Sequence, residues 1–176
     1  MRVDSTVLVG ALSAGCILLC SGAAYAGENG VSKVHSVQVT GTGTDLLNAA
    51  LVHSKKQTPT GMVQQSTEIV ELEGDLTGRV LYQVTSTIDY ANDSLLNTGD
   101  QVFSGTVAGS DPVMIHDGRF NFHVNLKTGA DTGFVYLVDH IAGPKVRCTL
   151  QIVGTGKDAD ANPTFRYSGH CDFRGK

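Results

Sequence analysis

The sequence is poor in charged residues and in proline, and it has no run of basic side chains. Asp, Glu, Lys and Arg make up 17% of its 176 residues, and there are four prolines. So few charges argue against a coiled coil and against a charged disordered chain. The 13 Lys and Arg residues are outnumbered by 17 Asp and Glu residues, which gives a net charge of −4. Because no basic stretch is present to neutralise phosphates, the sequence also argues against a nucleic-acid binder.

The motifs of common catalytic and metal centres are also absent. None of the histidines stands in H-x-H, H-x-x-x-H or H-E-x-x-H spacing, so we expect neither a metal site nor a bound cofactor. The glycine runs match neither G-x-G-x-x-G nor a Walker loop, and there is no G-x-S-x-G for a nucleophile. The six histidines are His35, His53, His116, His123, His140 and His170.

Glycine, valine and threonine are abundant instead. The chain holds 21 Gly, 20 Val and 17 Thr residues. Valine and threonine are β-branched and fit pleated strands, and glycine supplies turns and bulges. The composition therefore favours an all-β protein and argues against a helical bundle.

The first 26 residues are typical of a secretory signal. Arg2 precedes an apolar stretch at 7–19, and Ala24-Tyr25-Ala26 matches the small-x-small rule for cleavage after Ala26. The stretch is short for a membrane span, so we expect no stable membrane insertion. An uncleaved anchor and a lipoprotein attached through Cys16 or Cys20 stay open as alternatives. The sequence thus predicts a secreted or periplasmic protein with a short N-terminal tail at 27–33 and one domain at 34–176.

Two cysteines, Cys148 and Cys171, remain after removal of the signal. In an oxidising compartment an even pair usually forms a disulfide. Both residues fall on the apolar faces of the last two expected strands, 146–153 and 165–173, which supports pairing. A redox-active pair is the alternative, but such pairs usually stand close together as C-x-x-C.

Short apolar–polar alternations separated by turn residues run along the rest of the chain. They predict a single antiparallel eight-stranded barrel, with a β-sandwich as the alternative. A tight turn is expected at 74–75, a hairpin turn at 117–118, and polar loops at 54–61 and 89–100. The segment 46–53 fits either a short helix or an irregular strand. The other expected strands are 34–42, 67–74, 79–88, 101–107, 114–116, 119–126 and 134–140.

An apolar-x-Gly pattern recurs on the expected strands. Leu72-Glu73-Gly74 is echoed by Phe103-Ser104-Gly105 and Tyr167-Ser168-Gly169. Glycine inside a strand marks the bends that a small barrel needs. With its length and hydrophobic pattern, the chain resembles the allene oxide cyclase-like barrel group over roughly 34–173. The resemblance implies an eight-stranded barrel with a central cavity, in a group that includes cyclases acting on apolar, unsaturated small molecules.

Polar side chains on otherwise apolar faces are the candidate ligand-binding residues. An apolar cavity with a few convergent polar groups is the usual design of a ligand site. His35, His140 and Tyr136 are the catalytic candidates. The two histidines are the more plausible acid or base, because imidazole titrates near neutrality. The carboxylates Glu68, Glu71 and Glu73 could do acid–base work, but a solvated outer face is the simpler interpretation. The full candidate set is His35, Tyr82, Ser86, Tyr136, His140 and Tyr167.

Three hypotheses follow for the function. The first is an exported, disulfide-linked barrel that binds a small, largely apolar molecule. The second is a cyclase or isomerase acting on an apolar unsaturated molecule, and the third is an interaction scaffold that binds a protein partner through loops 54–61 and 89–100. A cavity filled by Phe120, Phe122, Phe134 and Phe165 would favour the scaffold, and an open one would favour the first two. Homo-oligomerisation stays open.

Overall fold

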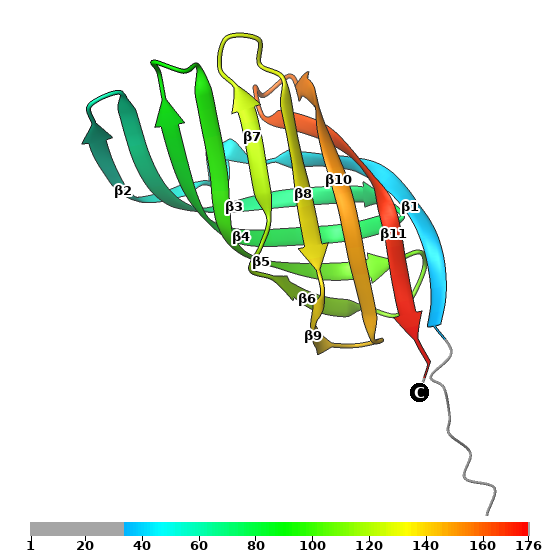
Figure 1. Ribbon diagram of the computed structural model, residues 1–176. Helices are drawn as coiled ribbons and strands as arrows, with labels where there is room; N and C mark the ends of the chain where they lie inside the picture. The colour runs from blue at the N-terminus through cyan, green and yellow to red at the C-terminus, as the bar shows by residue number, and fades with distance from the viewer. Residues whose placement is uncertain (1–33, 176) are drawn as a thin grey trace, which may run out of the picture. The chain divides into compact units, whose positions relative to one another are not determined.

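The structure is a computed structural model that describes residues 34–175. The expected signal at 1–26 and the tail at 27–33 lie outside the described residues. Figure 1 shows an all-β arrangement. Within residues 34–175 the strands are accompanied by a short 3₁₀ helix, η1. The elements are β1 Val34–Asp45, η1 Leu47–Ala49, β2 Leu51–Thr58, β3 Gly61–Gly74, β4 Leu76–Asp89, β5 Ser94–Val107, β6 Val113–Asp117, β7 Asn121–Asn125, β8 Asp131–Leu137, β9 Asp139–Ala142, β10 Val146–Lys157 and β11 Pro163–Arg174.

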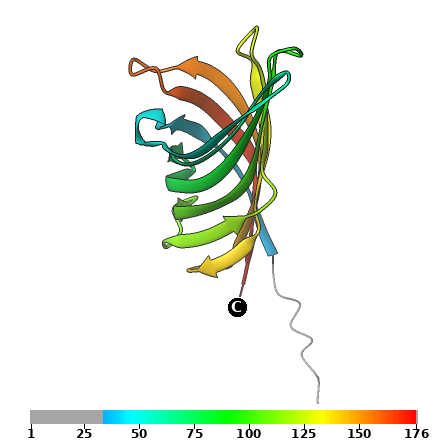
Figure 2. The ribbon, with the colours of Figure 1, turned by 90° about the vertical axis from the view of Figure 1, so that its left-hand side faces the viewer.

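Eight antiparallel strands close into a barrel, which confirms the predicted fold class. The ring runs β1-β11-β10-β8-β7-β5-β4-β3 and returns to β1. Figures 1 and 2 show β3, β4 and β5 crossing one side of the barrel at a steep angle to β8, β10 and β11 on the other. Closure pairs both edges of each ring strand over part of its length, which suits a chain so rich in β-formers.

Three strands lie outside the ring. β2 pairs with β3 as a hairpin, while β6 pairs with the second half of β5 and with β9. Every residue of β2 is exposed. Within residues 34–175, no helix has the length and apolar character needed to cross a membrane.

The last hairpin carries the predicted disulfide. Cys148 on β10 lies directly opposite Cys171 on β11, and the two sulfurs are bonded. Both residues are buried, as the alternating pattern predicted. Because β11 also pairs with β1, the crosslink lies next to the seam where the first and last strands of the chain meet.

Two predicted loops are wrong. The segment 54–61 is mostly β2, whose polar residues are tolerated because the strand lies outside the barrel. It is held by backbone pairing to β3 and by side-chain hydrogen bonds such as that from the Ser54 hydroxyl to Gln65. The segment 89–100 is a tight turn at 90–93 followed by the first half of β5. The ambiguous stretch 46–53 splits into η1 and the start of β2.

The predicted hairpin at 117–118 is also wrong, whereas the turn at 74–75 is confirmed. β6 and β7 do not pair with each other; both pair with β5, one after the other along its length. The buried Asp117 carboxylate fixes this arrangement. It accepts hydrogen bonds from the backbone N–H groups of Arg119 and Tyr136 and from the Gln101 amide.

Candidate functional site

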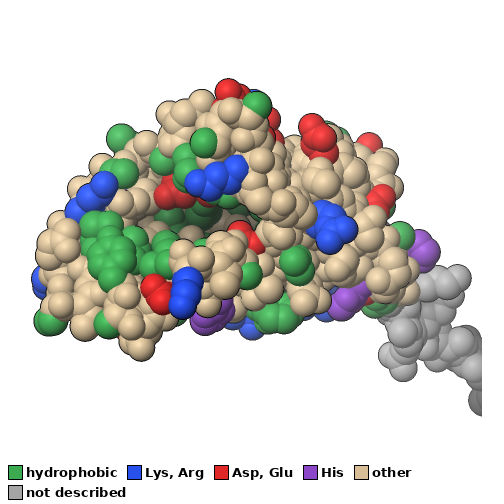
Figure 3. Space-filling view, turned by 90° about the horizontal axis from the view of Figure 1, so that it is seen from above, with side chains coloured by type: hydrophobic (Ala, Val, Ile, Leu, Met, Phe, Trp, Pro, Cys, Tyr) green, Lys and Arg blue, Asp and Glu red, His purple; other side chains and the backbone are tan. Residues whose placement is uncertain are grey.

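The barrel interior is part solid and part hollow. A cavity of about 430 Å³ opens at one end, and Figure 3 shows this hollow with hydrophobic side chains along its inside. Its wall is mainly apolar, with the following aliphatic and aromatic residues: Leu47, Val70, Leu72, Val80, Ile88, Leu95, Phe120, Phe122, Val124, Val135, Leu137, Leu150, Ile152, Pro163 and Phe165. The solid part is formed by a second group: Val39, Leu76, Phe103, Val107, Val113, Ile115 and Val146.

Of the four phenylalanines that were expected to decide whether the cavity is open, three belong to its wall. Phe120, Phe122 and Phe165 line the hollow without filling it. Phe134 lies on the outer face of β8 and is 44% exposed. The cavity is therefore open, which favours the hypotheses of a ligand-binding barrel or an enzyme over an inert scaffold.

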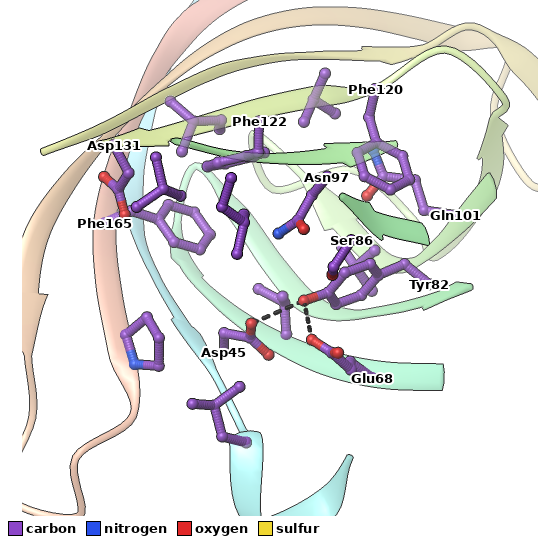
Figure 4. Close-up of a pocket in the computed structure, with 18 of the residues that line it drawn as sticks. Asp45, Glu68, Tyr82, Ser86, Asn97, Gln101, Phe120, Phe122, Asp131 and Phe165 are labelled. Atoms are coloured by element: carbon purple, nitrogen blue, oxygen red, sulfur yellow. Dashed lines mark hydrogen bonds between the residues drawn. The ribbon is translucent and has the colours of Figure 1, made fainter. Parts of the chain in front are cut away.

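An acidic cluster stands on the cavity wall across three neighbouring strands. Glu68 on β3 is paired directly with Tyr82 on β4, so their side chains share one face of the sheet. Asp45, the last residue of β1, is paired with Val70, two residues from Glu68 on the same face. Figure 4 shows the three side chains converging below Ser86 and Asn97.

Two short hydrogen-bond contacts meet at the Tyr82 hydroxyl. Its oxygen lies 2.7 Å from Asp45 Oδ2 and 2.6 Å from Glu68 Oε2. The Ser66 hydroxyl donates to the other Glu68 oxygen, Oε1, at 2.5 Å. A phenol has one proton to donate, so it can satisfy only one carboxylate. The second contact therefore calls for a proton on one of the two carboxyl groups.

The surroundings of Asp45 favour that proton. Burial raises the pKa of the Asp45 carboxyl to about 7; the hydrogen bond from Tyr82 opposes the rise, and the nearby Glu68 charge adds to it. Burial also raises the pKa of the Tyr82 phenol, so Tyr82 keeps its proton. The cluster therefore holds a carboxyl that gains and loses a proton near neutral pH inside an apolar cavity.

Other polar groups on the wall have different roles. The Tyr167 hydroxyl accepts from the Leu76 backbone N–H at 2.7 Å and donates to the Glu73 carbonyl at 3.0 Å. It thereby fixes the turn between β3 and β4, where Gly74 has a φ of +105° that favours glycine. At the mouth, the backbone N–H of Leu47 donates to the buried Asn162 side chain, which ties η1 to the turn between β10 and β11.

Three of the six predicted ligand-binding residues lie on the cavity wall. Tyr82, Ser86 and Tyr167 are buried there. Of these, Tyr167 is occupied by its bonds to the backbone, so Tyr82 and Ser86 are the stronger candidates for contact with a ligand.

The prediction that His35, Tyr136 and His140 face the interior is wrong. Tyr136 lies on the outer face of β8, where its ring stacks on Phe134 and lies under the Arg119 guanidinium. Residues 134–138 are apolar on both faces of the strand, so alternation could not decide which face points inward.

The two histidines lie at the ends of strands. His140 belongs to the outer strand β9, is exposed, and contacts the Gly143 carbonyl through Nε2. His35 shares a face with the buried Val39, but it is exposed at the start of β1. His123 and His170 are exposed as well.

Asp45 and Glu68 were missed as site residues. Glu71 and Glu73 lie on the outer face, as the simpler interpretation predicted, but Glu68 is only 7% exposed. The sequence did indicate the position of Glu68. Alternate residues of a strand point to the same face, so Glu68 lies on the inward face of β3 with Val70 and Leu72. Asp45 also lies on the same face of β1 as the buried Val39, but the strand was predicted to end at 42, so alternation was not extended to Asp45.

Within residues 34–175, no group of three or more His, Cys, Asp and Glu side chains is arranged to hold a metal ion. Comparison with protein-family models, with curated proteins and with solved structures found no match for this chain. The resemblance to the allene oxide cyclase-like barrels therefore remains a prediction.

Proposed function

We propose that the barrel binds one small, largely apolar molecule in its cavity, with a polar group of that molecule next to Asp45, Glu68 and Tyr82. The observation that carries this proposal is an open hollow of about 430 Å³, lined mainly by aliphatic and aromatic side chains, with one polar cluster on its wall. Ligand sites in proteins commonly span about 300–1,000 Å³ and have this combination of apolar walls and a few polar groups.

We further propose that the protein works outside the cytoplasm. The Cys148–Cys171 disulfide is typical of an oxidising compartment. The expected signal at 1–26, which lies outside the described residues, would direct the chain there.

Native mass spectrometry of the protein, purified from the compartment to which it is exported, tests the binding proposal. We expect a bound compound that is released on denaturation and that small-molecule analysis identifies as mainly apolar. The proposal would be contradicted if the purified protein carried no bound compound and also bound no member of a panel of small apolar compounds. A mass lower by two hydrogens than that of the mature chain would report the disulfide in the same spectrum.

A cyclase or isomerase is the second candidate function, and the proton shared around Tyr82 favours it. A carboxyl that titrates near neutral pH is suited to general acid–base catalysis. On this hypothesis Asp45 exchanges a proton with the bound molecule. Incubating the released compound with fresh protein in heavy water should then give an isomer or carry deuterium into carbon positions. An unchanged compound would leave binding as the only supported function.

A further inference from the structure

The charged side chains of the cavity wall are mainly acidic, and its other polar residues, such as Gln64, Ser86 and Gln101, are neutral. Asp45, Glu68 and Asp131 all line the hollow, and they come from β1, β3 and β8. Lys157 is the only Lys or Arg among the described lining residues, and it is exposed at the end of β10. In a cavity with apolar walls the field of such charges is weakly screened. The interior therefore favours a positive charge over a negative one.

Some acceptor oxygens of this wall have no hydrogen-bond donor. Among residues 34–175, three buried side-chain atoms lack a hydrogen-bond partner: Asp45 Oδ1, Asn97 Oδ1 and Asp131 Oδ1. All three are acceptor oxygens, and all three residues line the cavity. The single phenol proton of Tyr82 faces two carboxyl groups. The wall thus holds acceptor oxygens that no donor satisfies, which is costly for buried atoms.

We infer that the ligand of the proposed function is a cationic amphiphile, an amine on an apolar body, whose ammonium group lies beside Asp45 and Glu68. This inference rests on the proposed function and names the chemical class of its ligand. An ammonium group brings one positive charge and up to three donors. It supplies a counter-charge for the carboxylates and donors for the unpartnered oxygens, while the body of the molecule contacts the aliphatic and aromatic walls.

Ligands of other charge fit this wall less well. A carboxylate would bring a further negative charge beside Asp45 and Glu68 and no donor. An alcohol would bring one donor and no charge. Phe120, which packs edge-to-face on Tyr82 with ring centroids 5.9 Å apart, provides an apolar surface beside the cluster for the carbon atoms next to the amine.

Binding of an amine should be coupled to release of a proton. The titratable groups that face Asp45 are Glu68 from β3 and Tyr82 from β4. Burial raises the pKa of Asp45 to about 7, so this carboxyl is partly protonated at neutral pH. An ammonium group beside it favours the charged form. The affinity for an amine should therefore rise as the pH is raised through about 7. The affinity for an alcohol should change little over the same pH range.

Titration calorimetry with decylamine, decanol and decanoate, each kept below its micelle-forming concentration, tests the inference. We expect decylamine to bind at least about tenfold more tightly than decanol, and decanoate to bind most weakly. Equal binding of all three, or tightest binding of decanoate, would overturn the cationic ligand but leave an apolar-binding barrel. Binding of none would overturn the proposed function as well.

Matched variants locate the effect. Glu68→Gln and Asp45→Asn should each reduce the preference for decylamine over decanol about tenfold, and Asp45→Asn should abolish proton release measured in buffers of different ionisation enthalpy. Retained decanol binding shows that each variant is folded. Glu73→Gln, on the outer face of the same strand as Glu68, is the control and should change nothing. Cavity variants that keep the full preference would overturn the inference.

Discussion

At the scale of single residues, Asp45 connects the fold to its chemistry. It ends β1 at the point where the chain leaves the barrel wall and enters η1. Its carboxyl is held between the Tyr82 hydroxyl and the apolar cavity wall, with one oxygen buried and unpartnered. Such a group is stabilised by a proton rather than by a charge.

The raised pKa of Asp45 predicts how stability depends on pH. The carboxyl has its ordinary pKa of 3.8 in the unfolded chain and about 7 in the folded protein. Between these values the folded state holds a proton that the unfolded state has released. The contribution of Asp45 to stability is therefore full below about pH 4 and is lost as the pH rises through 7, by at most about 4 kcal/mol.

Urea unfolding of wild type and of Asp45→Asn, measured from about pH 4 to pH 8, checks this prediction. Asparagine resembles the protonated carboxyl but does not titrate. The variant should therefore gain stability relative to wild type as the pH rises. A constant difference across the range would mean that Asp45 is charged in the folded state throughout.

At the scale of elements, the C-terminal hairpin completes the barrel. β11 pairs with β10 along its length and with β1 on its other edge, so it joins the first and last strands of residues 34–175. The disulfide crosslinks this hairpin internally, and Tyr167 extends from β11 to the turn between β3 and β4. Loosening β11 would thus open the seam and release that turn.

Removing the disulfide should lower the free energy of unfolding, and the hairpin of β10 and β11 should be the first part to lose structure. Loop-closure entropy for a separation of 23 residues gives a loss of about 3 kcal/mol in Cys148→Ala/Cys171→Ala. Urea unfolding measures the total, and hydrogen exchange should show protection falling first in β10 and β11. Reducing agent should destabilise wild type and leave the variant unaffected. Equal stability of the two proteins would contradict the prediction.

The strands were predictable where one face is apolar and the other polar, and not elsewhere. β4, β10 and β11 have that contrast, and their inward faces were identified correctly. β2 has no buried face, and the first half of β5 has few buried residues, so hydrophobic pattern gave no sign of either. These segments are strands mainly because their backbones pair with a neighbouring strand. Backbone pairing does not require particular side chains, so the sequence does not show it.

At the scale of the whole molecule, the cavity exists because the barrel is filled unevenly. Large aliphatic and aromatic side chains close the interior in one part, whereas elsewhere the wall residues leave about 430 Å³ empty. The opening is bordered by η1 and by the turn between β10 and β11, which a single hydrogen bond from Leu47 to Asn162 connects.

Filling the cavity should abolish binding without unfolding the protein. Ile152 points into the hollow, and its neighbour Val153 points outward with 38% exposure. Ile152→Trp should weaken decanol binding at least about tenfold at a cost of about 1–3 kcal/mol in stability. Calorimetry and urea unfolding measure the two effects. Val153→Trp adds the same side chain outside the barrel and should bind as wild type does. Wild-type affinity in Ile152→Trp would place the ligand somewhere other than this cavity.

By itself the sequence determined the all-β class, the paired cysteines and the inward position of Tyr82 and Ser86, because each follows from composition, from the cysteine count or from alternation along one strand. It favoured an eight-stranded barrel, but only the pairing of β1 with both β11 and β3 decided between a barrel and a β-sandwich. The tertiary structure alone decided that Asp45, Glu68 and Tyr82 meet, that Tyr136 and His140 do not join them, and that the interior is hollow. Those features depend on register between strands and on where a strand bends. A shift of one residue would turn every side chain to the opposite face.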